Sequence, residues 1–199
     1  MERGVQMPEN EEDQKPQVPQ DPVLNEKLLK TRSVLVSGEI DKELADRVIR
    51  QLLVLESESD EPIRIYINSP GGDVDAGYAM FDMVRFISCD VCMIGMGLVA
   101  SAAALLYLAV PAERRLALPN STYLIHQPMS GMKGVATDIE IHARQIEKLR
   151  GKLDRLIAEQ TGKTVDEVTK DTERDYWMDA EEAKQYGLVS RIVTTRSDL

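Results

Sequence analysis

One apolar stretch, Val91–Pro111, constrains the fold of this chain more than any other feature. It contains no charged residue and a single serine, Ser101, near its middle. The first part, Val91–Met96, is typical of a fully buried strand, with Gly95 and Gly97 loosening the backbone after it. The alanine-rich second part, Ala102–Val110, predicts a helix that Pro111 ends. Ser101 therefore stands where a strand turns into a helix.

This junction suits Ser101 to nucleophilic chemistry. The first N–H groups of a helix have no intrahelical acceptor, and the helix dipole is positive at that end. Such donors can stabilise an oxyanion that forms beside the serine oxygen. Two other interpretations compete: a transmembrane helix, which the glycines and alanines make too weakly hydrophobic, and a core helix whose serine only packs. A catalytic role therefore requires a base elsewhere in the chain.

The composition limits the classes of protein to which the chain can belong. The chain has 199 residues, of which 43% are hydrophobic and 29% charged, which is enough for one domain with a substantial core. The net charge of −10 argues against nucleic-acid and membrane partners, which bind to basic surfaces. No basic N-terminus precedes an apolar segment, so we expect no secretory signal and a cytoplasmic location.

The chain begins with a segment of a different kind. Residues 1–22 hold four of the nine prolines, many acidic side chains and almost no apolar ones. Such a segment cannot bury enough apolar surface to offset its ordering entropy. We predict a disordered, acidic and proline-rich tail over residues 1–22, followed by one globular domain over residues 23–199.

The two cysteines, Cys89 and Cys92, form a C-x-x-C motif, a spacing found in redox centres and zinc sites. No second pair of cysteines completes four zinc ligands. We interpret both as ordinary core or turn residues, and we expect no metal and no cofactor.

Alternating strand and helix patterns predict an α/β fold with a parallel sheet. Period-two or continuous apolar patterns predict strands at Ser33–Ser37, Ile63–Ile67, Tyr123–Ile125 and Leu188–Val193. Apolar residues at helical spacing predict two helices, Asp41–Glu56 and Asp73–Ser88, each between two predicted strands. This order is that of βαβ units, whose strands lie parallel in one sheet.

A long helix is predicted from a capping box at Thr137–Glu140 to Gly162. Its apolar residues step by three and four, with His142 in the same series, at Ile139, Ile146, Leu149, Leu153 and Leu156. This seam is similar to that of a coiled coil. It can pack on its own domain or, in part, against a second copy of the chain. Further capping boxes are predicted at Thr164–Glu167 and Asp179–Glu182.

A candidate base follows Ser101 by twenty-five residues. His126 ends the strand Tyr123–Ile125, and catalytic groups on α/β sheets gather at the carboxyl ends of strands. A carboxylate should orient the imidazole, and spacing does not choose among Asp171, Glu173, Asp175 and Asp179. The Gly71-Gly72 turn can present an N–H group to an oxyanion without steric obstruction.

Six segments in order carry a resemblance to a known family. They are Tyr66–Gly72 (YINSPGG), Gly97–Ser101 (GLVAS), Ile125–Pro128 (IHQP), Ala136–Ala143 (ATDIEIHA), Asp171–Asp175 (DTERD) and Glu181–Leu188 (EEAKQYGL). Together, over about residues 24–195, they resemble the proteolytic subunit of the Clp protease. The resemblance implies a crotonase-like ββα spiral within the α/β class, with a long handle helix in a handle over about residues 129–160.

The resemblance also implies roles for individual residues. Ser101 matches the nucleophile, His126 the general base and Asp175 the orienting acid, and the N–H groups of Gly72 and Ala102 match the oxyanion hole. Positions that match substrate-binding residues are Gly71, Val74 and Met129. Positions that match contacts between subunits, in two stacked seven-membered rings, are Arg174, Ile139, Ile146 and Leu149.

The implied function is that of an ATP-dependent-type Clp serine endopeptidase subunit. It would hydrolyse unfolded proteins and short peptides inside an oligomeric chamber, with a Clp ATPase unfoldase as a further partner. Two alternatives remain: a catalytically silent or regulatory ring subunit beside an active paralogue, and a crotonase-type enzyme acting on acyl-CoA thioesters. The intact Ser, His and Asp argue against the first. The absence of a basic pocket for a phosphorylated cofactor argues against the second.

Overall fold

The computed structural model describes residues 22–199, so the predicted tail over residues 1–22 lies outside the described residues except for Pro22, which begins helix α1. The α-helices are α1 (Pro22–Lys30), α2 (Lys42–Glu58), α3 (Val74–Phe86), α4 (Ala102–Tyr107), α5 (Ala136–Thr161), α6 (Val165–Asp171) and α7 (Ala180–Tyr186). The strands are β1 (Ser33–Ser37), β2 (Ile63–Ser69), β3 (Val91–Ala100), β4 (Arg115–Ala117), β5 (Thr122–Ile125), β6 (Tyr176–Asp179) and β7 (Arg191–Ile192).

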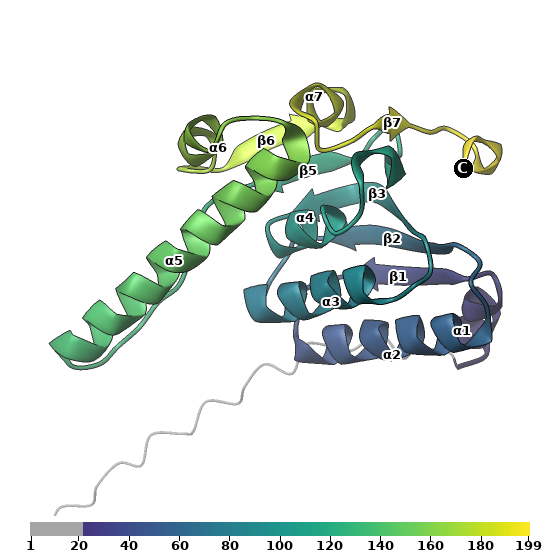
Figure 1. Ribbon diagram of the computed structural model, residues 1–199, viewed down its shortest axis with the longest axis horizontal. Helices are drawn as coiled ribbons and strands as arrows, with labels where there is room; N and C mark the ends of the chain where they lie inside the picture. The colour runs from purple at the N-terminus through teal and green to yellow at the C-terminus, as the bar shows by residue number, and fades with distance from the viewer. Residues whose placement is uncertain (1–21) are drawn as a thin grey trace, which may run out of the picture.

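The strands form one sheet with the order β1-β2-β3-β4-β7, all parallel (Figure 1). Strand β5 pairs in parallel with the end of β3, and β6 pairs antiparallel with β5. Because side chains alternate along a strand, Val34 and Ile65 belong to the large core shared with the helices, whereas Ile94 and Leu116 form a small cluster on the opposite face. The predicted α/β fold is confirmed.

Strand β3 continues beyond its predicted end at Met96 and reaches Ala100. The register between β2 and β3 shifts between Ile67 and Ser69, and there the Asn68 side chain accepts a hydrogen bond from the Leu98 N–H at 3.1 Å. Gly97 has a φ of +58°, and a Cβ at this position would lie only 2.6 Å from Oδ1 of Asn68. The absence of a side chain at Gly97 therefore allows the Asn68 side chain to bond to β3 at the register shift. Ser101 directly follows the carboxyl end of this strand.

Two short strands were not predicted, and one was predicted too long. Strands β4 and β6 have three and four residues, which is too short for a pattern of period two to be recognised. Strand β7 covers Arg191–Ile192 and not the whole of Leu188–Val193. Strand β6 matters most for the site, because its pairing of Tyr176 with Ile125 brings the acidic segment before Tyr176 next to His126.

The long helix α5 projects from the body of the domain (Figure 1). The predicted capping box at Thr137–Glu140 is wrong: the N-cap is Val135, without a side-chain cap bond, and the helix has already begun at Ala136. The predicted end is confirmed, because Gly162 adopts the left-handed conformation with a φ of 75°. The capping boxes at Thr164–Glu167 and Asp179–Glu182 are both present.

The apolar seam of α5 divides into two parts. Leu149, Leu153 and Leu156, in the C-terminal half, pack against the core of the domain. In the N-terminal half, Ile139 keeps 45% of its surface exposed, and Ile146 is partly buried. The C-terminal half thus anchors the helix, and the N-terminal half offers an apolar surface to solvent or to another chain.

The structure shows the form that the apolar stretch takes and the surroundings of the two cysteines. Val91–Pro111 forms a strand and a short helix, and no helix within residues 22–199 is long and apolar enough to cross a membrane. Both cysteines are free thiols, Cys89 is buried, and burial raises the pKa of the Cys92 thiol. The described part of the chain contains no group of three or more His, Cys, Asp or Glu side chains placed to hold a metal ion.

Candidate active site

Ser101 occupies the junction of β3 and α4 as its sequence context predicts. It is the N-cap of α4, with a φ of 54° and a ψ of −120°, and its N–H donates to the Leu124 carbonyl at 2.9 Å. Non-glycine residues with positive φ are rare and strained, and such residues cluster at functional sites. The turn points the hydroxyl away from the helix and toward the end of β5.

At that end lies His126, which links Ser101 to Asp175. The Ser101 hydroxyl lies 2.8 Å from Nε2 of His126, and Nδ1 of His126 lies 3.2 Å from Oδ1 of Asp175. A carboxylate can only accept, so this contact fixes the proton on Nδ1 and leaves Nε2 free to accept from the hydroxyl. The three side chains thus form a continuous line of contacts, with a hydrogen bond between Ser101 and His126 and a polar contact between His126 and Asp175.

The geometry distinguishes the four candidate acids. Asp175 is the one that contacts His126 within residues 22–199. Asp171 accepts a hydrogen bond from the Tyr186 hydroxyl at 3.0 Å, and Asp179 caps helix α7 through the Glu182 N–H. Glu173 offers its carbonyl, not its carboxylate, to the Gln127 side chain. The choice that spacing left open is made by the pairing of β5 with β6.

The Gly71-Gly72 turn lies directly beside Ser101. The turn is held by Ile40, whose N–H donates to the Gly71 carbonyl and whose carbonyl accepts from the Asp73 N–H, both at 2.8 Å. Within residues 22–199, the N–H groups of Gly72 and Ala102 have no acceptor. Two N–H groups without an acceptor therefore belong to the segments next to Ser101, and donors aimed at a developing oxyanion can stabilise it.

A side chain at Gly71 should disrupt this arrangement, because a Cβ there would lie 2.8 Å from the Cβ of Ser101 and 2.9 Å from the Ala102 nitrogen. We expect Gly71→Ala to lower kcat for peptide cleavage about 10²-fold, the typical cost of losing one oxyanion donor. The matched control is Gly38→Ala, since Gly38 also has a positive φ, of +85°, but a Cβ at that position would meet no atom within 4 Å. Gly38→Ala should cost about 1–2 kcal/mol of stability and leave the activity of the folded protein unchanged. Equal kcat losses in both variants would contradict the placement of the turn.

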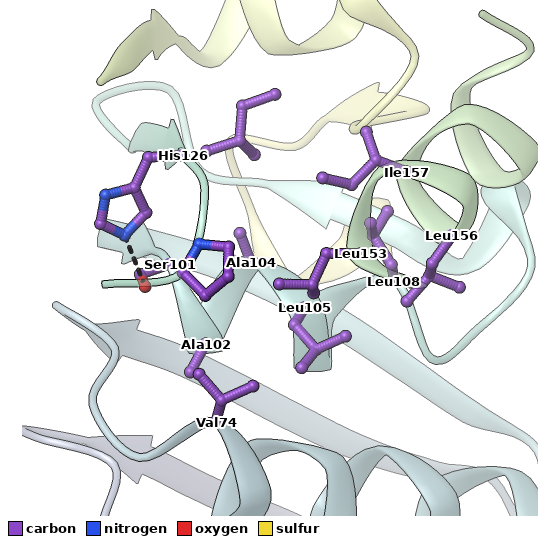
Figure 2. A pocket seen from close by; sticks show the side chains of 12 residues that line it. Val74, Ser101, Ala102, Ala104, Leu105, Leu108, His126, Leu153, Leu156 and Ile157 are labelled. Atoms are coloured by element: carbon purple, nitrogen blue, oxygen red, sulfur yellow. Dashed lines mark hydrogen bonds between the residues drawn. The ribbon is translucent and has the colours of Figure 1, made fainter. Parts of the chain in front are cut away.

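An apolar cavity opens next to Ser101 and His126 (Figure 2). Val74, at the start of α3, and Leu105, on α4, face Leu153 and Ile157 of α5 across it. The alanine at position 102 also contributes to this lining. Met129 is not among the lining residues and is 79% exposed. The cavity is suited to an uncharged side chain of a ligand held beside the serine.

Of the residues predicted to join subunits, three lie on α5 and Arg174 adjoins Asp175 of the site. Ile146 and Leu149 are partly buried on α5, Ile139 is exposed, and Arg174 is exposed beside Asp175. Nε2 of His142, a half-buried residue of α5, lies 2.8 Å from the Ser130 hydroxyl.

Three polar residues near the triad were not predicted. The Gln127 N–H donates to the Thr172 carbonyl at 2.7 Å, and Thr172 in turn donates its hydroxyl to the buried Asp154. One sequence signal could have indicated Asp154: it is a charged residue between Leu153 and Leu156 of the apolar seam. Nothing in the spacing could have linked it to Thr172, eighteen residues away.

Comparison with known proteins places this geometry in a family. The family model for Clp protease matches residues 20–196. The chain is 55% identical to ATP-dependent Clp protease proteolytic subunit 2 of Treponema denticola, over 96% of each chain. It is 51% identical to proteolytic subunit 3 of Rhizobium johnstonii, over 96% of this chain and 98% of the relative.

A solved structure extends the likeness to the fold. A point mutant of ClpP1 from Listeria monocytogenes superposes with a TM-score of 0.82 at 48% identity, over 87% of this chain and 98% of that chain. This match confirms the fold that the sequence resemblance implied, including the long handle helix. From its sequence, its fold and the residues gathered around Ser101, the chain belongs to the Clp protease family.

Proposed function

We propose that this chain is a serine endopeptidase subunit that hydrolyses peptide bonds of unfolded proteins and short peptides. The observation that carries the proposal is the line of contacts from Ser101 through His126 to Asp175: the Ser101 hydroxyl is hydrogen-bonded to Nε2 of His126 at 2.8 Å, and Nδ1 of His126 lies 3.2 Å from Oδ1 of Asp175. Family membership supports it, since the relatives are named proteolytic subunits of an ATP-dependent protease.

The proposed mechanism follows from the geometry. Oγ of Ser101 attacks the carbonyl carbon of the peptide bond while Nε2 of His126 takes the hydroxyl proton. Asp175 stabilises the resulting imidazolium, and the N–H groups of Gly72 and Ala102 bind the oxyanion. His126 then donates the proton to the leaving amine, and an acyl-enzyme remains on Ser101. Water, activated by the same histidine, hydrolyses the ester and restores the serine.

The proposed chamber rests on the handle and on Arg174. The exposed side chain of Ile139 belongs to the N-terminal half of α5, the helix that projects from the domain, and a second copy of α5 can cover it there (Figure 1). We propose a homo-oligomer of two stacked seven-membered rings in the cytoplasm, with a Clp ATPase unfoldase as partner. A silent ring subunit is the alternative, but the contacts that join Ser101, His126 and Asp175 favour an active one.

Hydrolysis by the purified full chain tests the proposed function. We expect cleavage of a short fluorogenic peptide and of an unfolded protein such as reduced, alkylated casein. The same preparation should not act on an acyl-CoA thioester. An assembled protein that cleaves neither polypeptide would favour the silent subunit, and turnover of the thioester alone would favour the crotonase-type enzyme.

Arg174 offers a test of the link between assembly and activity. We expect Arg174→Ala to weaken ring stacking and peptidase activity together, because Arg174 adjoins Asp175 and truncating a central interface arginine typically costs about 2 kcal/mol or more. Analytical ultracentrifugation beside the peptide assay measures both effects. Arg50→Ala is the control, since Arg50 is an exposed arginine that pairs with Asp46 within α2. A large particle of normal activity in Arg174→Ala would refute the link.

A further inference from the structure

Helix α5 carries a buried carboxylate that the triad does not use. Asp154 is only 3% exposed, and it accepts hydrogen bonds from two threonine hydroxyls. Thr172 donates to Oδ1 and Thr169 donates to Oδ2, each at 2.9 Å, and Nε of Arg150 lies 4.0 Å from Oδ2. Burying a charged group is costly unless it is hydrogen-bonded, so these bonds account for how the carboxylate is tolerated. They do not account for why a charge stands there.

Thr172 connects this network to the residues next to His126 and Asp175. Thr172 is the C-cap of α6 and begins the turn that carries Asp175 into β6. Its carbonyl accepts from the N–H of Gln127, the neighbour of His126, at 2.7 Å. The Gln127 side chain donates to the Glu173 carbonyl, also at 2.7 Å. The turn is therefore held on one side by the residue next to His126 and on the other by Asp154 of α5.

Asp175 depends on this support. Its side chain is 59% exposed, so packing restrains it little, and a single contact of 3.2 Å joins it to His126. An exposed side chain pays rotamer entropy to hold one geometry. The carboxylate can stay within reach of Nδ1 only if the backbone that carries it is fixed. The pairing of Tyr176 with Ile125 fixes it on one side, and the bonds of Thr172 and Gln127 fix it on the other.

From these contacts we infer that Asp154 and Thr172 are positioning residues for the triad, and that through them helix α5 sets the distance between Asp175 and His126. The inference rests on the proposed function, in which Asp175 orients the imidazole. Leu153 and Ile157 of the same helix segment line the cavity beside Ser101. One segment of α5 thus holds both the cavity wall and the acid of the triad, so a change in its position alters both.

A pair of threonine variants separates positioning from stability. Thr172→Val and Thr169→Val each remove one hydroxyl bond of 2.9 Å to the same carboxylate and keep the shape of the side chain. Thr172 belongs to the turn that carries Asp175, whereas Thr169 lies within α6. We expect Thr172→Val to lower kcat by about 10- to 100-fold with KM nearly unchanged, the range expected for a misplaced catalytic group. Thr169→Val should stay within about 2-fold of the parent protein.

The pH profile and a double variant identify the route of the effect. Loss of the carboxylate partner destabilises the imidazolium, so the acidic limb of the profile of kcat/KM should move to lower pH in Thr172→Val and not in Thr169→Val. In an Asp175→Asn background, Thr172→Val should add no further loss, because its effect passes through Asp175. Asp154→Ala should reproduce the defect, and Asp154→Asn, which keeps an acceptor for Thr172, should restore most of the rate.

The outcomes distinguish this inference from the proposed function. If the parent protein cleaves no peptide, the proposed function fails before the variants are compared. If it cleaves peptides but Thr172→Val and Thr169→Val lose activity equally, or neither loses any, the inference is wrong. It is also wrong if Thr172→Val retains its full effect in the Asp175→Asn background. Melting temperatures and particle size, measured for each variant, ensure that only folded and assembled protein is compared.

Discussion

We expect Ser101→Ala to lower kcat for peptide hydrolysis by about 10⁶-fold, the scale of loss when a serine protease loses its nucleophile. The substitution removes a single oxygen atom and its 2.8 Å hydrogen bond to His126. The surrounding residues Ala100 and Ala102 are small and buried, so the backbone has no reason to rearrange. Stability and assembly should therefore be unaffected, and single-turnover kinetics beside sedimentation measures both.

The chain provides its own control for this prediction. Ser130 also lies 2.8 Å from Nε2 of a histidine, His142, but no carboxylate within residues 22–199 contacts that histidine. Ser130→Ala removes the same kind of bond on the handle and should leave kcat within about 2-fold, as surface substitutions usually do. Substantial peptide turnover by Ser101→Ala, or a comparable loss in Ser130→Ala, would contradict the assignment of the nucleophile.

Asp175→Asn should lower kcat by about 10⁴-fold, because an asparagine at this position stabilises the wrong imidazole tautomer. Its amide can donate to Nδ1, which would move the proton to Nε2 and prevent that nitrogen from accepting the Ser101 proton. Asp171→Asn is the matched control, since Asp171 lies in the same acidic segment but accepts from Tyr186. Steady-state kinetics across pH compares the two. A larger loss in Asp171→Asn would show that the wrong acid has been chosen.

Much of the fold follows from local patterns in the sequence. The helices α2, α3 and α5 and the strands β1, β2 and β5 lie close to their predicted positions, because long apolar periods and glycine ends determine them. The end of β3 was missed because Gly95 and Gly97 normally weaken a strand. Here the Asn68 side chain compensates across the register shift, a contact that only the folded sheet creates.

The candidate site also contains residues that the sequence could predict and residues that it could not. Ser101 and His126 could be predicted because each ends a recognisable strand, and residues at such ends gather at one edge of a sheet. Asp175 could not be chosen from spacing, because its position depends on β6, a strand of four residues paired antiparallel to β5. The network of Asp154, Thr172 and Gln127 was missed for a related reason, since it joins three elements that are distant in the sequence.

The apolar seam of the handle helix α5 could be predicted from the sequence, but what it packs against could not. The seam along α5 allowed packing on its own domain or on a second copy of the chain. Leu149, Leu153 and Leu156 pack on the domain, whereas Ile139 is left exposed, so the two ends of the seam have different surroundings. The apolar residues recur with the same period in the buried and in the exposed part of the seam, so the sequence could not show where burial ends.

Covalent labelling with a fluorophosphonate probe tests the central claim most directly, because such a probe reacts only with a serine whose hydroxyl an adjacent base activates. The full chain is labelled, digested and analysed by mass spectrometry. We expect one phosphonate adduct, on Ser101, formed in step with the loss of peptidase activity and absent from Ser101→Ala. An adduct on another serine, or an assembled protein that cleaves peptides without reacting at Ser101, would contradict it.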